Sequence, residues 1–88
     1  MKLWILKPAD LVLGKENPWE PWYDKCFGFV IRAEDEASAR LAANEQAGDE
    51  VYPDSGEKTA WLDPSYSTCD ELQTDGEAGI LMKDFRSI

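Results

Sequence analysis

The sequence predicts an α+β fold in which a small antiparallel sheet of about four strands carries one main helix packed on one face. Two observations lead to this class. Apolar residues recur with strand spacing in four short segments, and one longer segment has helical spacing and helix-end signals. The predicted order along the chain is β-β-α-β-β. With 88 residues, the chain is expected to form a single domain over residues 1–88.

The stretch on which this prediction depends most is residues 26–48, where a strand runs directly into a helix. Phe27, Phe29 and Ile31 alternate with the residues between them, so side chains point to both faces of a sheet. Because apolar groups occur at both sets of positions, this strand is expected to be covered on both faces and to be central.

The helix is expected over residues 35–47. Asp35 is suited to cap its first turn, and Gly48 is a natural stop. On the solvent side, Arg40 can pair with Glu36 four residues earlier. An apolar stripe is expected to face the sheet, and it comprises Ala39, Ala42, Ala43 and Ala47, flanked by Ala37 and Leu41.

Three other strands are predicted from shorter patterns. Residues 2–7 form the first, residues 59–62 form a short one, and residues 80–85 form the last. A short helix, capped by a serine and ending near Leu72, is expected before the last strand.

Negative charge is concentrated in the middle of the chain. The net charge is −9, but residues 34–77 hold 13 acidic and two basic residues, whereas the remainder is slightly basic, at +2. An acidic surface repels nucleic acid and attracts basic protein surfaces. The acidity therefore indicates either a functional acidic face or simply a soluble surface, and the sequence leaves both readings open.

Residues 18–23, with the sequence PWEPWY, bring two Pro-Trp steps and a tyrosine close together. Proline favours an extended backbone here and for the residue before it. One reading is that Trp19 and Trp22 cover one end of a small core. The other is that they form an aromatic contact for a protein partner, since Trp is enriched in interface hot spots.

The residue types needed for common catalytic sites are scarce. The chain has no histidine, and its two cysteines, Cys26 and Cys69, do not have Cys-x-x-Cys spacing. We therefore expect a non-enzymatic protein without a metal or cofactor, and with both cysteines reduced. The apolar run at the start is too short for a signal peptide or a membrane span. We expect a cytoplasmic location in a bacterial host and no membrane partner.

The leading functional hypothesis is an inhibitor that uses an acidic surface to block a basic nucleic-acid-binding site on a host complex. A helix of about 13 residues spans about 20 Å, over which carboxylates can imitate phosphates. The lack of basic stripes argues against direct nucleic-acid binding. The alternative is a small protein–protein interaction module that uses the Pro-Trp loop. The expected contact residues are Glu34, Asp35, Glu36, Glu45, Asp49, Glu50, Asp70, Glu71, Asp75, Glu77, Trp19 and Trp22.

Two blocks of the sequence, PWYDKCFGFVIRAEDEASARLAA and WLDPSYSTCDEL, resemble a family of small acidic proteins of phages and bacteria. The resemblance covers about half of the chain. It implies an origin in a phage or another mobile element and an anti-CRISPR function, with a CRISPR effector complex or another nucleic-acid-binding protein as the partner. The matching blocks contain strand, helix-start and loop features, and they assign no functional residue.

Overall fold

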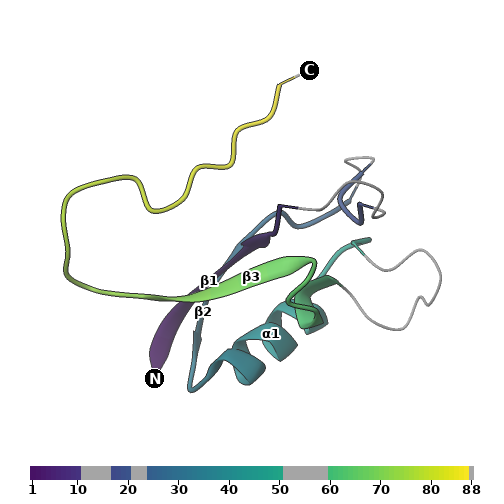
Figure 1. The fold of residues 1–88 in the computed structure, drawn as a ribbon. Coiled ribbons are helices and arrows are strands. Elements are labelled where there is room, and N and C mark those ends of the chain that lie inside the picture. Colours follow the sequence, from purple (N-terminus) through teal and green to yellow (C-terminus); the bar gives the residue numbers. More distant parts are fainter. Residues whose placement is uncertain (11–16, 21–23, 51–59, 88) are drawn as a thin grey trace.

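The computed structural model describes residues 1–10, 17–20, 24–50 and 60–87 of the chain. Within these ranges, the chain forms a three-stranded antiparallel sheet, one α-helix and one 3₁₀ turn (Figure 1). The elements are β1 (Lys2–Pro8), β2 (Phe29–Ala33), α1 (Glu36–Glu45), η1 (Ala60–Leu62) and β3 (Ser67–Leu72). The α+β class is confirmed, but the described part of the chain has three strands, not about four.

The central strand of the sheet is β1, which pairs with β2 on one side and with β3 on the other, both antiparallel. Trp4 lies opposite Ile31 of β2, and Leu6 lies opposite Cys69 of β3. The prediction that the strand following Cys26 is central is therefore wrong, because β2 lies at an edge. Its Phe29, Ile31 and Ala33 side chains share the face that packs against α1, whereas Val30 on the other face is 58% exposed.

Helix α1 confirms the helix predicted from the sequence. The Asp35 carboxylate accepts a hydrogen bond of 2.8 Å from the Ser38 backbone N–H, which satisfies one free donor of the first turn. After the helix, the Asp49 N–H donates to the Asp24 carbonyl at 2.8 Å. A Cβ atom at Gly48 would meet this same carbonyl oxygen, so the close approach of the two segments requires glycine.

The core lies between the sheet and α1. Ala39 and Ala43 are fully buried, as the predicted stripe requires, while Ala42 and Ala47 are partly buried. Small side chains on this face let the helix lie close to the sheet, where Leu6 of β1 is fully buried. The hydrophobic effect therefore acts mainly at this one layer boundary.

Three aromatic rings fill the end of this core. Trp61 of η1 is fully buried and packs edge-to-face against Trp19 and Phe29, with ring centroids 5.4 and 5.1 Å apart. Such aromatic pairs are worth about 0.5–1.5 kcal/mol beyond the area that they bury. The rings thus join η1 to β2 and to the segment that precedes it.

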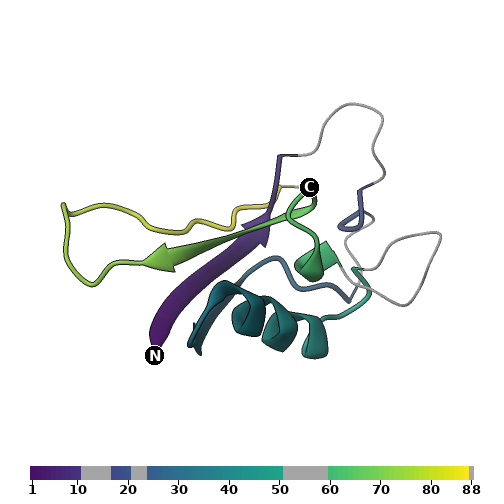
Figure 2. The same cartoon turned by 60° about the horizontal axis from the view of Figure 1, so that its bottom comes forward.

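The C-terminal segment, residues 73–87, lies on the face of the sheet opposite α1 (Figures 1 and 2). It contains no strand, so the prediction of a last strand over residues 80–85 is wrong. Its side chains contact the residues that lead into β2, because Met82 lies against Gly28 and the Arg86 guanidinium lies over the Phe27 ring. The segment crosses this face instead of extending the sheet at an edge.

The chain around β3 also differs from the prediction. Residues 60–62 of the strand predicted over residues 59–62 form the 3₁₀ turn η1, whereas residue 59 lies outside the described residues. β3 is a strand where the sequence predicts a short helix. The Asp63 carboxylate accepts from the Ser65 N–H, and the Asp63 carbonyl accepts from the Ser67 N–H. These bonds form a tight turn that leads into β3, so the serines belong to a turn and not to a helix cap.

Candidate functional site

Nine of the ten acidic residues that the sequence predicts as contact residues are exposed to solvent. The exposed ones are Glu34, Asp35, Glu36, Glu45, Asp49, Asp70, Glu71, Asp75 and Glu77. They divide into two groups, one along α1 and one along β3 and the C-terminal segment.

The first group, which we call the acidic helix side, comprises Glu34, Asp35, Glu36, Glu45 and Asp49. Three of these carboxylates lie at the beginning of α1 and two at its end. A helix of ten residues is about 15 Å long, and the flanking residues extend the group to about 20 Å along the helix axis. Glu36 and Glu45 are nine residues apart, so at 3.6 residues per turn their side chains lie on opposite sides of α1, with Glu36 beside the buried Arg40. Figure 1 shows α1 on the outside of the molecule, with the whole sheet on its other side.

The carboxylates at the start of α1 have local structural roles. The hydrogen bonds from Ser38 hold the pKa of Asp35 below its ordinary value. Glu36 accepts from the Arg40 Nε atom at 2.8 Å, which confirms the predicted pair. Because the helix dipole is positive at this end, the stability of the helix is itself a sufficient reason for these acids.

Helix stability does not explain the carboxylates at the end of α1. Glu45 lies in the last turn, and α1, all of which is described, has no basic residue in that turn. The helix dipole is negative there, so a carboxylate costs about 0.3–1 kcal/mol. Asp49 follows four residues later and is also exposed. Helix formation disfavours Glu45, and this makes it the strongest candidate for a contact residue.

The second group does not continue the acidic helix side. Strand alternation places Asp70 and Glu71 of β3 on opposite faces of the sheet. Lys2 forms an ion pair with Glu71, with an N···O distance of 3.6 Å. Asp75 and Glu77 lie in the C-terminal segment, where it turns back at one end of the sheet and away from α1 (Figures 1 and 2). The ten predicted acids therefore do not form one surface.

Glu50 is fully buried, so the prediction of an exposed carboxylate at this position is wrong. Its Oε2 atom accepts from the Trp61 Nε1–H at 2.7 Å, and the Cys26 backbone N–H lies 3.1 and 3.2 Å from the two carboxylate oxygens. A buried indole N–H needs an acceptor, and Glu50 supplies it. Glu50 is a structural residue that joins η1 to the chain before β2.

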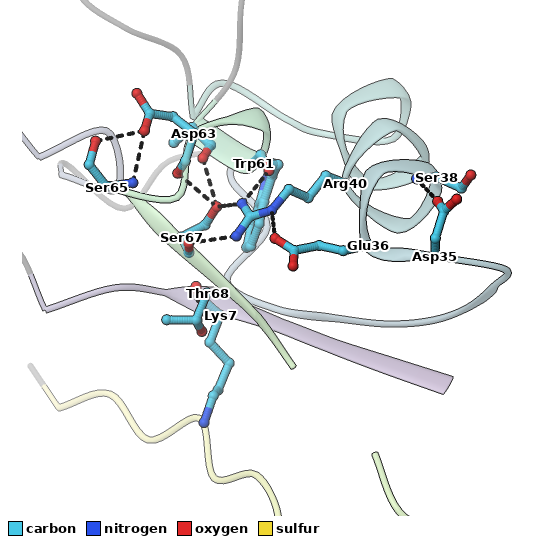
Figure 3. Close-up of polar contacts among 11 residues, drawn as sticks. Lys7, Asp35, Glu36, Ser38, Arg40, Trp61, Asp63, Ser65, Ser67 and Thr68 are labelled. Atoms are coloured by element: carbon cyan, nitrogen blue, oxygen red, sulfur yellow. Dashed lines mark hydrogen bonds and ion pairs between the residues drawn. The ribbon is translucent and has the colours of Figure 1, made fainter. Parts of the chain in front are cut away.

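Arg40 is a second buried charged residue, and sequence reasoning places it wrongly on the solvent side. Only 7% of its surface is exposed. Its Nη1 atom donates to Ser67 Oγ at 2.8 Å and to the Trp61 carbonyl at 2.9 Å, and its Nη2 atom donates to the Ser67 carbonyl at 3.1 Å (Figure 3). These bonds tie α1 to η1 and to β3. The sequence carries one signal for this site, the spacing between Glu36 and Arg40.

Trp19 is part of the core, which supports the first of the two readings of the Pro-Trp residues. The residue is 3% exposed, and its Nε1–H donates to the Cys26 carbonyl at 2.8 Å. Trp22, the other predicted aromatic contact, lies outside the described residues.

The chain also carries two thiols, those of Cys26 and Cys69. Cys26 and Cys69 are both free, and burial raises the pKa of both thiols, with a smaller contribution from Glu50 at Cys26. Among the residues that the structure describes, no group of three or more His, Cys, Asp or Glu side chains could hold a metal ion. None of the helices in the described ranges has the length and apolar character needed to cross a lipid bilayer.

No family model, curated protein or solved structure matches this chain. The resemblance to small acidic proteins of phages and bacteria therefore stays a prediction. The acidic helix side is the feature of the described chain that indicates a binding function.

Proposed function

We propose that this protein is a non-enzymatic inhibitor whose acidic helix side occupies a basic, nucleic-acid-binding groove of a protein partner. In its most specific form, the protein comes from a phage or another mobile element, acts in the bacterial cytoplasm, and blocks a CRISPR effector complex. The observation that carries the proposal is the acidic C-terminal end of α1. Glu45 is exposed at a position where a carboxylate weakens the helix. Helix stability therefore does not explain Glu45, whereas contact with a basic partner does.

The charge density of the acidic helix side favours a groove for a single strand. Five carboxylates, one of them paired with Arg40, give about four net negative charges over about 20 Å. A single nucleic-acid strand has about six charges over that length, and a duplex has about twelve. The surface is therefore closer to one strand than to two, and a channel for guide RNA or displaced DNA fits it better than a duplex groove.

The proposal predicts that Glu45→Lys combined with Asp49→Lys weakens binding without weakening the fold. Binding is measured with a purified CRISPR effector complex that carries its guide RNA, at low and at moderate salt. We expect the dissociation constant to rise at least about tenfold, because each change replaces an attraction by a repulsion. The free energy of unfolding should stay the same or rise by about 0.3–1 kcal/mol, because lysine suits the end of a helix.

The matched control is Asp75→Lys combined with Glu77→Lys, which changes the net charge equally but lies away from α1. This variant should keep most of the binding. Equal losses in the two variants would mean that net charge alone matters, and the acidic helix side would then have no special role. If the unchanged protein does not bind the effector complex or displace its nucleic acid, the anti-CRISPR form of the proposal is wrong.

A further inference from the structure

The side of the molecule opposite α1 exposes large apolar side chains. We call this side the outer face; it consists of the sheet surface that points away from α1 and residues 80–87 of the C-terminal segment. Val30 of β2 is 58% exposed, and Ile80, Leu81 and Phe85 are 81%, 65% and 73% exposed. Four of the six exposed large apolar residues in the described chain therefore belong to this side. Ile80, Leu81 and Phe85 lie within one six-residue stretch of chain, and such a concentration of exposed apolar side chains is typical of a protein contact site.

The C-terminal segment is held to the sheet by its inner side chains, and this leaves its outer side chains in solvent. Met82 lies against Gly28, and Arg86 lies over the Phe27 ring. Ile5 of β1 is only 5% exposed although strand alternation directs it away from α1, so the segment covers the centre of this face. Because Met82 and Arg86 face the sheet, the side chains of Leu81 and Phe85 are left to the solvent.

The outer face carries charges of both signs, unlike the acidic helix side. Alternation places Lys7 and Arg32 on it, and Figure 3 shows Lys7 directed away from α1. Asp70 of β3 has the same orientation, since it lies opposite Ile5. Lys83 is exposed in the C-terminal segment. Two copies of such a face can bring opposite charges together, whereas two acidic helix sides repel each other.

We propose that the outer face is the contact between two copies of this chain in a symmetric dimer. The exposed side chains of Leu81 and Phe85 form the centre of the contact, and the mixed charges form its rim. A twofold axis suits this arrangement because the same patch is used on both copies. A standard interface buries about 800 Å² on each partner, which is about one eighth of the 6347 Å² surface of this chain. The acidic helix sides then point outward, one on each side of the dimer.

The test is the mass of the full chain in solution, measured by sedimentation equilibrium or by light scattering over a wide dilution series. We expect a concentration-dependent dimer that persists in high salt, because apolar contacts dominate it. Leu81→Glu and Phe85→Glu should each raise the dimer dissociation constant at least about tenfold, since each places a charge in the apolar centre. Circular dichroism should remain unchanged, because both side chains already lie in solvent.

The matched control is Leu41→Glu, which changes an apolar residue of α1 that is 51% exposed. This variant should dimerise like the unchanged chain. A chain that stays monomeric at every concentration would overturn the proposal, and so would a dimer that is weakened by Leu41→Glu but not by Leu81→Glu. The inference is independent of the proposed inhibitor function, because a dimer can form without binding an effector complex and binding can occur without a dimer.

Discussion

Between the sheet and α1, buried polar side chains join elements that are far apart in the sequence, whereas on the outer face one extended segment lies across the strands without pairing. Arg40 and Glu50 are both at most 7% exposed, and each bonds to η1, through the Trp61 carbonyl and the Trp61 indole respectively. On the outer face, the Met82 and Arg86 side chains contact Gly28 and Phe27, the two residues that lead into β2.

The two regions differ in how much a substitution should cost in folding free energy. A buried polar group that loses its partner costs the full desolvation energy of that group, so the buried layer between the sheet and α1 tolerates few changes. The outer face has apolar side chains that already contact water, so changes there cost little folding energy. Substitutions in the buried layer and on the outer face should therefore separate effects on folding from effects on association between copies of the chain.

The largest expected effect is that of Arg40→Ala. The substitution leaves the Ser67 and Trp61 carbonyls and the Ser67 hydroxyl without their buried donor. We expect the free energy of unfolding to fall by about 3 kcal/mol, a large share of the total for a chain of this size. Urea unfolding followed by tryptophan fluorescence measures it.

The control for this variant is Lys2→Ala, which removes the exposed ion pair with Glu71. Surface pairs are worth at most about 1 kcal/mol, so this change should have a small effect. Similar losses for the two variants would contradict the role given to the buried guanidinium.

The next prediction compares two glycines, one on each side. At Gly48 a Cβ would meet the Asp24 carbonyl oxygen, which is fixed because it accepts from the Asp49 N–H. At Gly28 a Cβ would meet the end of the Met82 side chain, which can rotate away. We expect Gly48→Ala to cost about 1–3 kcal/mol and Gly28→Ala to cost less than about 1 kcal/mol.

Urea unfolding of both variants decides this comparison. Equal costs would mean that the C-terminal segment is fixed as firmly as the chain that follows α1. The outer face would then be part of the core, and the contrast between the two sides would fail.

Local patterns in the sequence predict the local features correctly. Residues 2–7 contain the alternation that gives β1, and Asp35 caps α1 as its position before the helical stripe indicates. The pair between Glu36 and Arg40 also follows from spacing alone. Each of these features depends on residues at most a few positions apart, which is the range over which such patterns carry information.

The features that the sequence does not predict depend on partners far along the chain. Which strand is central depends on where β3 pairs. Residues 80–85 have the period of a strand but form none, and Met82 among them lies against Gly28. Arg40 and Glu50 look like surface residues until Ser67 and Trp61 are placed beside them. For the candidate site, the sequence predicts the exposed acids along α1. It does not predict that the acids of the C-terminal segment lie away from them.

The smallest expected effect concerns the start of α1 and its dependence on pH. Because the hydrogen bonds from Ser38 lower the pKa of Asp35 in the folded state, the ionised carboxylate stabilises the fold above its unfolded pKa of about 3.9. This contribution is lost as the pH falls through the lower, folded pKa. Asp35→Asn keeps a capping oxygen but cannot titrate, so the unchanged chain should be more stable at neutral pH, and the difference should shrink in acid.

Thermal unfolding of both chains from neutral pH to about pH 2.5 measures this difference, and the titration of all other acids cancels because the two chains share them. A difference that stays constant over the whole range would mean that the charge of Asp35 does not act on the helix. Helix stability would then not explain the acids at the start of α1, although this explanation is what distinguishes them from Glu45. Glu45 would then no longer differ from the acids at the start of α1, and all five carboxylates of the acidic helix side would need the same explanation.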